Sequence, residues 1–168
     1  MVLTKRELIA SLQHEVHILL HLTSKIDRQQ LAYRPGAKQR STLELLRYLT
    51  VMGPELITAV KAGRFDVASW IAALREADAR DFDQTVASIG TQRTVYADLI
   101  SSIPDAAFRD EIEMFGRKAS RGSIIVNIVL GGCAAYRTQL FLYLKACGRD
   151  ELSTTNLWAG IDAPAAAV

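Results

Sequence analysis

The chain has 168 residues, of which 49% are hydrophobic and 23% are charged. This balance excludes a disordered chain, and the length suits one domain that can bury a core without a metal or a disulfide. Twenty Lys and Arg residues against eighteen Asp and Glu residues give a net charge of +2, which is too small to indicate a dedicated nucleic-acid-binding protein.

The first helical pattern begins near Thr4, an N-cap candidate that has Glu7 three residues further on. Its apolar residues recur at helical spacing and form one stripe: Leu8, Leu12, Val16, Leu19 and Ile26. A connector over 27–39 carries the turn signal Pro35-Gly36. The second pattern opens on a capping box, Ser41-Thr-Leu-Glu44, and we expect it to end at Gly63.

Two further long helices are predicted, over 82–103 and 123–147. The segment 65–81 suits a short helix that lies over the others, and 108–121 is either an irregular loop or a small hairpin. The last helix is apolar almost all round as far as Arg137, which is typical of the buried centre of a bundle or of an oligomer contact. The predicted fold is all-α: a four-helix bundle over 1–160, with an accessory segment between helices 2 and 3 and a flexible tail over 161–168.

The cysteines and the apolar runs predict a cytoplasmic protein. Cys133 and Cys147 fall on one predicted helix about 21 Å apart, which is too far for a disulfide, and unpaired thiols suit a reducing compartment. The first residues lead into a charged helical pattern and not into an apolar signal region. The longest uncharged run, 122–136, is shorter than the roughly 20 residues that cross a bilayer, so we expect a buried helix and no membrane contact.

His14, His17 and His21 are the only histidines, and all three lie on the first predicted helix. His17 and His21 are one helical turn apart, a spacing that can hold a divalent metal. On a helical wheel, however, all three fall roughly opposite the apolar stripe, and an exposed pair without a third ligand is a poor metal site. We therefore expect a solvated face or a subunit contact, with an interfacial metal site between two copies of the chain as the alternative.

Two stretches of the sequence carry a resemblance to a known family. Leu31-Ala-Tyr-Arg-Pro-Gly36 through Arg40-Ser-Thr-Leu-Glu-Leu-Leu-Arg-Tyr-Leu-Thr50 looks like the entry to the second helix of the DinB-like (DinB/YfiT-type) family. Tyr136-Arg-Thr-Gln-Leu140, followed by Tyr143-Leu-Lys-Ala-Cys-Gly148, resembles the closing signature of that family, and Asn156-Leu-Trp-Ala-Gly160 is similar to the ending of some members. The resemblance implies a four-helix bundle that is commonly a homodimer.

The resemblance also implies a metal held by three histidines, one on the second helix and two on the fourth. Some relatives use that metal as thiol-dependent transferases, isomerases or hydrolases. The corresponding positions here are Tyr48, Gly132 and Tyr136. A phenol binds metal poorly at neutral pH and glycine has no side chain, so we expect neither the metal site nor any other cofactor.

The replacements leave two interpretations open. Either Tyr48, Met52, Tyr136 and Arg137 line a pocket for a small molecule, or the core has repacked after the loss of the metal site. We expect a neighbouring helix, or a ring such as Tyr48, to pack against the bare backbone at Gly131-Gly132. The hypothesis is a metal-free homodimer that is non-catalytic or binds a small molecule. The alternative is an enzyme of the same fold that uses non-metal groups, such as a tyrosine acid or base, or an atypical metal site.

Overall fold

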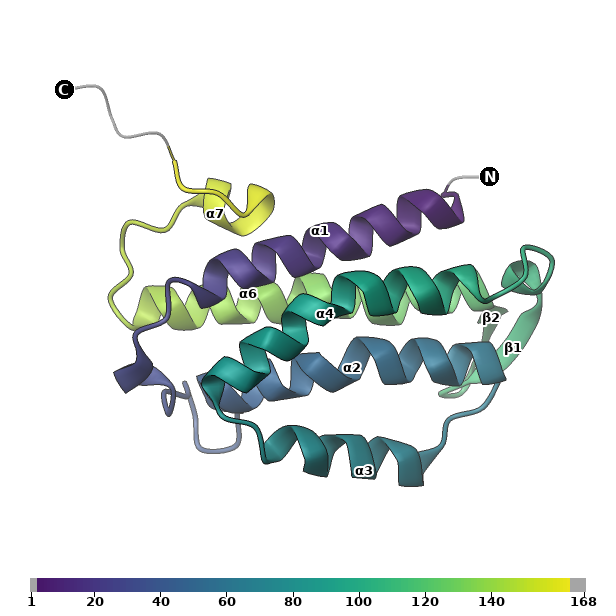
Figure 1. Cartoon of the computed structure of the whole chain (residues 1–168), viewed down its shortest axis with the longest axis horizontal. Coiled ribbons are helices and arrows are strands. Elements are labelled where there is room, and N and C mark those ends of the chain that lie inside the picture. Colours follow the sequence, from purple (N-terminus) through teal and green to yellow (C-terminus); the bar gives the residue numbers. More distant parts are fainter. Residues whose placement is uncertain (1–2, 164–168) are drawn as a thin grey trace.

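In the computed structural model, which describes residues 3–163, four long helices lie side by side (Figure 1). They are α1 (Lys5–Thr23), α2 (Thr42–Ala62), α4 (Phe82–Ser101) and α6 (Gly131–Ala146). Helices α1 and α2 each pack against both α4 and α6. The predicted all-α four-helix bundle is thereby confirmed.

Local capping fixes where the long helices begin. The Thr4 side chain accepts a hydrogen bond from the backbone N–H of Glu7, and the Glu7 carboxylate accepts one from the Thr4 backbone N–H. Ser41 and Glu44 form the same reciprocal pair at α2. Helix α2 ends at Gly63, whose φ of 71° is left-handed and favours glycine.

The core fills the space between the four helices. Its largest fully buried side chains are aliphatic apart from Met52 and one aromatic: Tyr96, Leu8, Leu12, Ile18, Leu22, Leu45, Leu46, Met52, Ile57, Ile89, Ile100 and Ile103. Helices α2 and α4 pack together, and Gly53 of α2 faces the Tyr96 side chain of α4. A Cβ at position 53 would lie 2.0 Å from the Tyr96 hydroxyl oxygen, so only glycine fits there.

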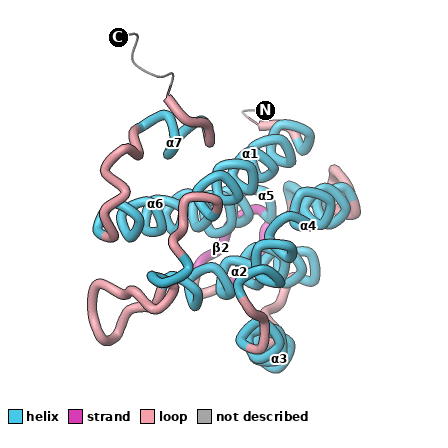
Figure 2. The backbone as a smooth tube through the Cα atoms, turned by 60° about the vertical axis from the view of Figure 1, so that its left-hand side comes forward, coloured by secondary structure: helices cyan, strands magenta, loops and turns pink. Residues whose placement is uncertain are grey.

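The accessory segment is a helix, α3 (Val67–Asp78), which packs on α2 outside the bundle (Figure 2). Asp66 caps it by accepting hydrogen bonds from the backbone N–H groups of Ala68 and Ser69. Its position between the second and third long helices is as predicted.

The segment 108–121 contains a small hairpin, which decides between the two alternatives left open by the sequence. Strands β1 (Glu111–Met114) and β2 (Arg117–Ser120) pair antiparallel. A two-residue turn joins them, with left-handed φ at both positions: 54° at Phe115 and 70° at Gly116. Such turns match the twist of paired strands, although phenylalanine is an unusual occupant of the first position.

The last long helix is continuous from Arg121 to Ala146 but not uniform. It begins as α5 (Arg121–Ile124), passes through a π-helical segment (Ile125–Leu130) and continues as α6. It is the only helix of residues 3–163 that is long and apolar enough to cross a membrane, and only 33% of its most apolar window is buried. The expectation of a buried helix therefore holds only in part, because one face is exposed. The exposed residues of this helix are Ser123, Asn127, Gly131, Ala135, Thr138, Leu142 and Ala146.

A short helix that the sequence reasoning did not predict, α7 (Thr154–Ala159), packs on α1 (Figure 1). It ends at Gly160, where a Cβ would lie 2.9 Å from the Cα atom of Ile18. Part of the segment expected to be a flexible tail is held by contacts, because Asp162 accepts a hydrogen bond of 2.6 Å from Lys25. Residues 164–168 of that tail lie outside the described residues.

Candidate functional site

The three positions that correspond to the family's metal ligands converge between α2 and α6. The rings of Tyr48 and Tyr136 meet edge to face, with centroids 5.1 Å apart. Gly132 lies against Met52, since a Cβ at position 132 would be 3.2 Å from the Met52 methyl carbon. Met52 of the neighbouring helix α2 therefore packs against the bare backbone of α6, which is the first of the two expected arrangements.

A row of aromatic rings extends from this point along α3. Trp70 meets Tyr48 with ring centroids 6.1 Å apart, and Phe65 meets Trp70 at 5.5 Å. Phe115, at the hairpin turn, ends the row 5.3 Å from Phe65. The Arg40 guanidinium lies 3.8 Å from the centre of the Tyr48 ring, close enough for a cation–π contact. We call Tyr48, Tyr136, Trp70 and Met52 the aromatic cluster.

Burial makes Tyr48 a weak acid. Burial of the side chain is the larger cause and hydrogen bonding with Tyr136 is the smaller one, and together they raise the pKa of Tyr48 to about 12. The phenol thus stays protonated at neutral pH. It can donate or accept a hydrogen bond, but it offers neither a phenolate base nor an anionic metal ligand.

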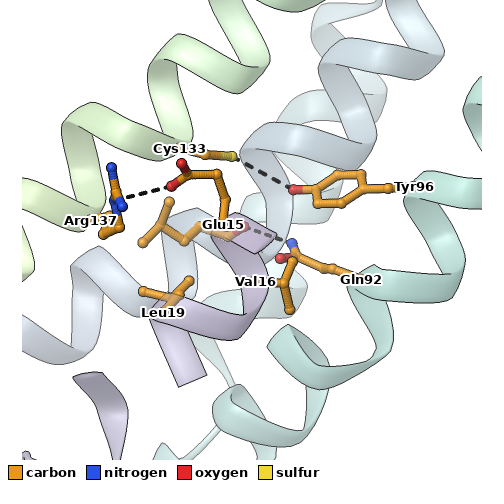
Figure 3. A pocket seen from close by; sticks show the side chains of 8 residues that line it. Glu15, Val16, Leu19, Gln92, Tyr96, Cys133 and Arg137 are labelled. Carbon is orange, nitrogen blue, oxygen red and sulfur yellow. Dashed lines mark hydrogen bonds and ion pairs between the residues drawn. The ribbon is translucent and has the colours of Figure 1, made fainter. Parts of the chain in front are cut away.

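Arg137 does not join the aromatic cluster. It projects from α6 toward α1, where its Nε lies 3.1 Å from a carboxylate oxygen of Glu15 (Figure 3). It also donates a hydrogen bond of 2.6 Å to the carbonyl of Leu157, and its guanidinium lies 5.1 Å from the centre of the Trp158 ring. Arg137 is only 3% exposed, so the predicted pocket of Tyr48, Met52, Tyr136 and Arg137 is not one site.

Glu15 is a residue that the sequence reasoning missed. Desolvation raises its pKa, and the Arg137 charge opposes that rise. The Glu15 oxygen and the Arg137 Nε are close but poorly aligned, because neither atom has a hydrogen-bond partner within the described residues. A helical wheel could have indicated Glu15, since it lies only about 60° from Leu12 at the edge of the apolar stripe.

A cavity of about 10 Å³ adjoins this ion pair and is lined in part by Gln92, Tyr96 and Cys133 (Figure 3). A space of that size holds about one water molecule and no larger ligand. Burial raises the pKa of the Cys133 thiol to about 12, so this cysteine stays protonated and unreactive at neutral pH. The ion pair and its surroundings are therefore structural.

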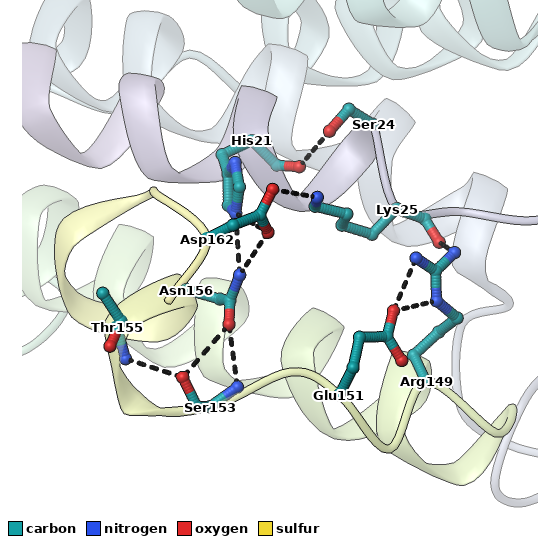
Figure 4. Close-up of polar contacts among 9 residues, drawn as sticks. All are labelled: His21, Ser24, Lys25, Arg149, Glu151, Ser153, Thr155, Asn156 and Asp162. Carbon is teal, nitrogen blue, oxygen red and sulfur yellow. Dashed lines mark hydrogen bonds and ion pairs between the residues drawn. The ribbon is translucent and has the colours of Figure 1, made fainter. Parts of the chain in front are cut away.

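The chain's own C-terminal segment covers only part of the histidine face of α1: His17 and His21 are half-buried, whereas His14 stays exposed, as expected of a solvated face. His14 donates through Nε2 to the carbonyl of Trp158 (3.0 Å), and His21 Nε2 accepts a hydrogen bond from the side-chain amide of Asn156 (3.0 Å, Figure 4). Desolvation lowers the pKa of His21, which favours the neutral imidazole that this bond requires.

The paired histidines have partners other than a metal. Arg93 lies 3.4 Å from the Nδ1 atom of His17. No group of three or more His, Cys, Asp or Glu side chains within residues 3–163 is arranged to hold a metal ion.

Comparison with solved structures finds a protein of similar fold. The fold is similar to that of YjoA, a DinB-like protein from Bacillus subtilis, with a TM-score of 0.66 at 17% sequence identity. The match covers 86% of this chain and 94% of YjoA. The chain has a DinB-like fold. The sequence matches no family model and no curated protein.

The resemblance to the DinB-like family implies that relatives hold a metal with histidines at the positions that correspond to 48, 132 and 136. Here the donors would be two phenols and the thioether of Met52, with no side chain at Gly132. Divalent metals in such sites need neutral imidazoles, carboxylates or thiolates. The residues present do not fit the trihistidine metal.

Proposed function

We propose that this DinB-like protein is a cytoplasmic homodimer that binds a small molecule at its aromatic cluster without the metal of the family. The observation that carries the proposal is the convergence of Tyr48, Tyr136 and Gly132, backed by Met52, at the positions implied for the metal ligands. The place for a ligand is retained, while the chemistry of its lining has changed from imidazole to aromatic ring.

The cluster suits a flat apolar or aromatic molecule. Tyr48, Tyr136 and Trp70 are each only partly buried, so their rings present both contact area and hydroxyl or indole groups. Arg40, exposed above Tyr48, adds a positive charge beside the rings. An aromatic ligand with an acidic substituent would satisfy both features.

The test uses Trp70 as a probe of the cluster. Trp158→Phe removes the only other tryptophan, so emission then reports on Trp70 alone. We expect aromatic carboxylates from a screened set to change this emission saturably, and Tyr136→Ala to weaken their binding at least tenfold. Phe82→Ala, which removes a half-buried ring on α4, is the matched control. Binding unaffected by Tyr136→Ala, or stoichiometric zinc or nickel that survives dialysis of untagged protein, would contradict the proposal.

The outward face of the last helix supports the homodimer. Gly131, Ala135, Thr138 and Leu142 are exposed and uncharged, and they recur at helical spacing along one face. Small residues allow close approach of a second helix, and apolar area removed from water stabilises the contact. Sedimentation should give a dimer for the native chain and a monomer for Ala135→Glu, whereas Ala87→Glu on α4 should remain dimeric. A native monomer at micromolar concentration would contradict this part of the proposal.

An enzyme that uses tyrosine as an acid or base is the alternative, and phenol titration discriminates between the two. We expect Tyr48 to ionise near pH 12 and this component of the titration to disappear in Tyr48→Phe. The reason is that burial disfavours the phenolate. Ultraviolet difference absorbance measures the ionisation, and a phenol titrating between pH 7 and 9 would favour the enzyme instead.

A further inference from the structure

The beginning of α1 and the hairpin that precedes the last long helix lie at the same end of the bundle (Figure 1). Residues of these segments line a concave surface. Its volume is about 1160 Å³, which exceeds the roughly 300–1,000 Å³ of a typical small-molecule site. It shares no lining residue with the aromatic cluster. We call it the N-terminal groove. Its lining includes four apolar residues and two arginines: Leu3, Leu8, Phe108, Val126, Arg6 and Arg109.

The base of the N-terminal groove is apolar. Leu8 is fully buried beneath it, and Leu3, Phe108 and Val126 are half-buried around it. The Phe108 ring is held in place by Gly122, because a Cβ at position 122 would lie 2.6 Å from a ring carbon. The groove thus offers a preformed apolar surface rather than one that must be assembled on binding.

The rim of the groove is positively charged. Lys5 and Asp105 form an ion pair of 2.8 Å, and Lys5 also donates to the carbonyl of Ile103. Arg6 and Arg109 form no ion pair with any residue in 3–163, and both are exposed. After the Lys5–Asp105 pair is subtracted, the lining therefore carries two uncompensated guanidinium groups, which can bind a carboxylate or phosphate through several N–H groups.

We propose that the N-terminal groove binds an amphiphilic anion: a molecule with an apolar chain over Leu3, Phe108 and Val126 and an acidic head group near Arg6 and Arg109. Neither the apolar base nor the charged rim of the groove is expected to bind a ligand tightly by itself. Exposed charge pairs contribute little by themselves, and an uncharged apolar ligand leaves both arginines without a partner. This site is independent of the proposed function, because the aromatic cluster lies elsewhere and uses other residues.

Straight-chain carboxylates test the proposal because chain length and charge can be varied separately. We expect decanoate, below its micelle concentration, to bind one per chain and to shift the backbone amide NMR signals of Arg6, Phe108 and Val126. Each CH₂ between octanoate and dodecanoate should tighten Kd by up to about fourfold. Acetate and decanol, which each lack one half of the ligand, should bind at least tenfold more weakly than decanoate.

Matched variants localise the binding. Arg109→Glu should weaken decanoate binding at least tenfold, and Ala106→Trp should block the groove, since Ala106 lines it. Arg75→Glu changes the net charge equally but lies on α3, away from the groove, and should leave Kd unchanged. An equal loss of decanoate affinity in Arg109→Glu and Arg75→Glu would overturn the proposal. Saturable NMR shifts confined to residues of the aromatic cluster would also overturn it. Binding to phosphatidylglycerol vesicles without binding to free decanoate would also overturn it, in favour of a membrane surface.

Discussion

Gly53→Ala is expected to lower the free energy of unfolding by about 3 kcal/mol, at the upper end of what overpacking a core usually costs. The added methyl group would lie 2.0 Å from the Tyr96 hydroxyl oxygen and 2.7 Å from the carbon that bears it. Tyr96 is 1% exposed and borders a cavity of only about 10 Å³, which is too small for its ring to move into, so α2 and α4 must move apart. For a chain of this size the loss corresponds to a fall in Tm of roughly 6–12 °C.

Gly90→Ala is the matched control, because it makes the same chemical change at a helical position with no atom within 4 Å of the new Cβ. It should leave stability unchanged or raise it by up to about 1 kcal/mol, as alanine is the better helix former. Tyr96→Phe should recover part of the Gly53→Ala loss by removing the nearest clashing atom. Thermal unfolding of the native chain, Gly53→Ala, Gly90→Ala and the double variant Gly53→Ala with Tyr96→Phe measures these differences. Equal Tm values for Gly53→Ala and Gly90→Ala would refute the packing argument.

Arg137→Met should destabilise the fold by about 3–5 kcal/mol at pH 7, because it leaves the Glu15 carboxylate buried without its counter-charge. The Glu15 side chain is 13% exposed, and its ionic partner within the described residues is Arg137, 3.1 Å away. Denaturant unfolding of the native chain and the variant gives the difference. A loss below about 1 kcal/mol would mean that water or a side-chain rearrangement compensates the charge.

The destabilisation by Arg137→Met should shrink as the pH falls toward 4. Arg137 is the charge that opposes the desolvation of Glu15, so its removal raises the Glu15 pKa further. The unfolded chain releases this proton near pH 4.3, whereas the folded variant keeps it until a higher pH. The folded state thus binds more protons in that window, and stability is lost as pH rises through it.

The double variant Glu15→Leu with Arg137→Met is the control for the ion pair. Replacing both charges with apolar side chains is often neutral or stabilising, so most of the stability lost in Arg137→Met should return. A double variant as unstable as Arg137→Met would show that the contacts of Arg137 with Leu157 and Trp158 outweigh its contact with Glu15.

The sequence alone predicted the bundle because its signals are local. Capping at Thr4 and Ser41, the glycine at 63 and the apolar stripe of the first helix each depend on residues within a turn or two of one another. The resemblance to the DinB-like family implied that positions 48 and 136 lie close together, and the ring contact at 5.1 Å agrees with this.

No local pattern in the sequence predicts α7. That helix has only six residues, too few for a periodic pattern, and its partners on α1 lie up to 144 residues away in the chain. The wheel correctly turned the histidines away from the bundle core, but it could not show what covers them.

The sequence by itself determined the four long helices, their order and the absence of histidine at positions 48, 132 and 136, since these follow from residue types, capping residues and short-range periodicity. Only the tertiary structure decided that Arg137 pairs with Glu15, that Met52 backs Gly132 and that α7 packs beside the histidine face. Each of these contacts depends on the rotation and approach of two separate helices, which no pattern within either helix fixes.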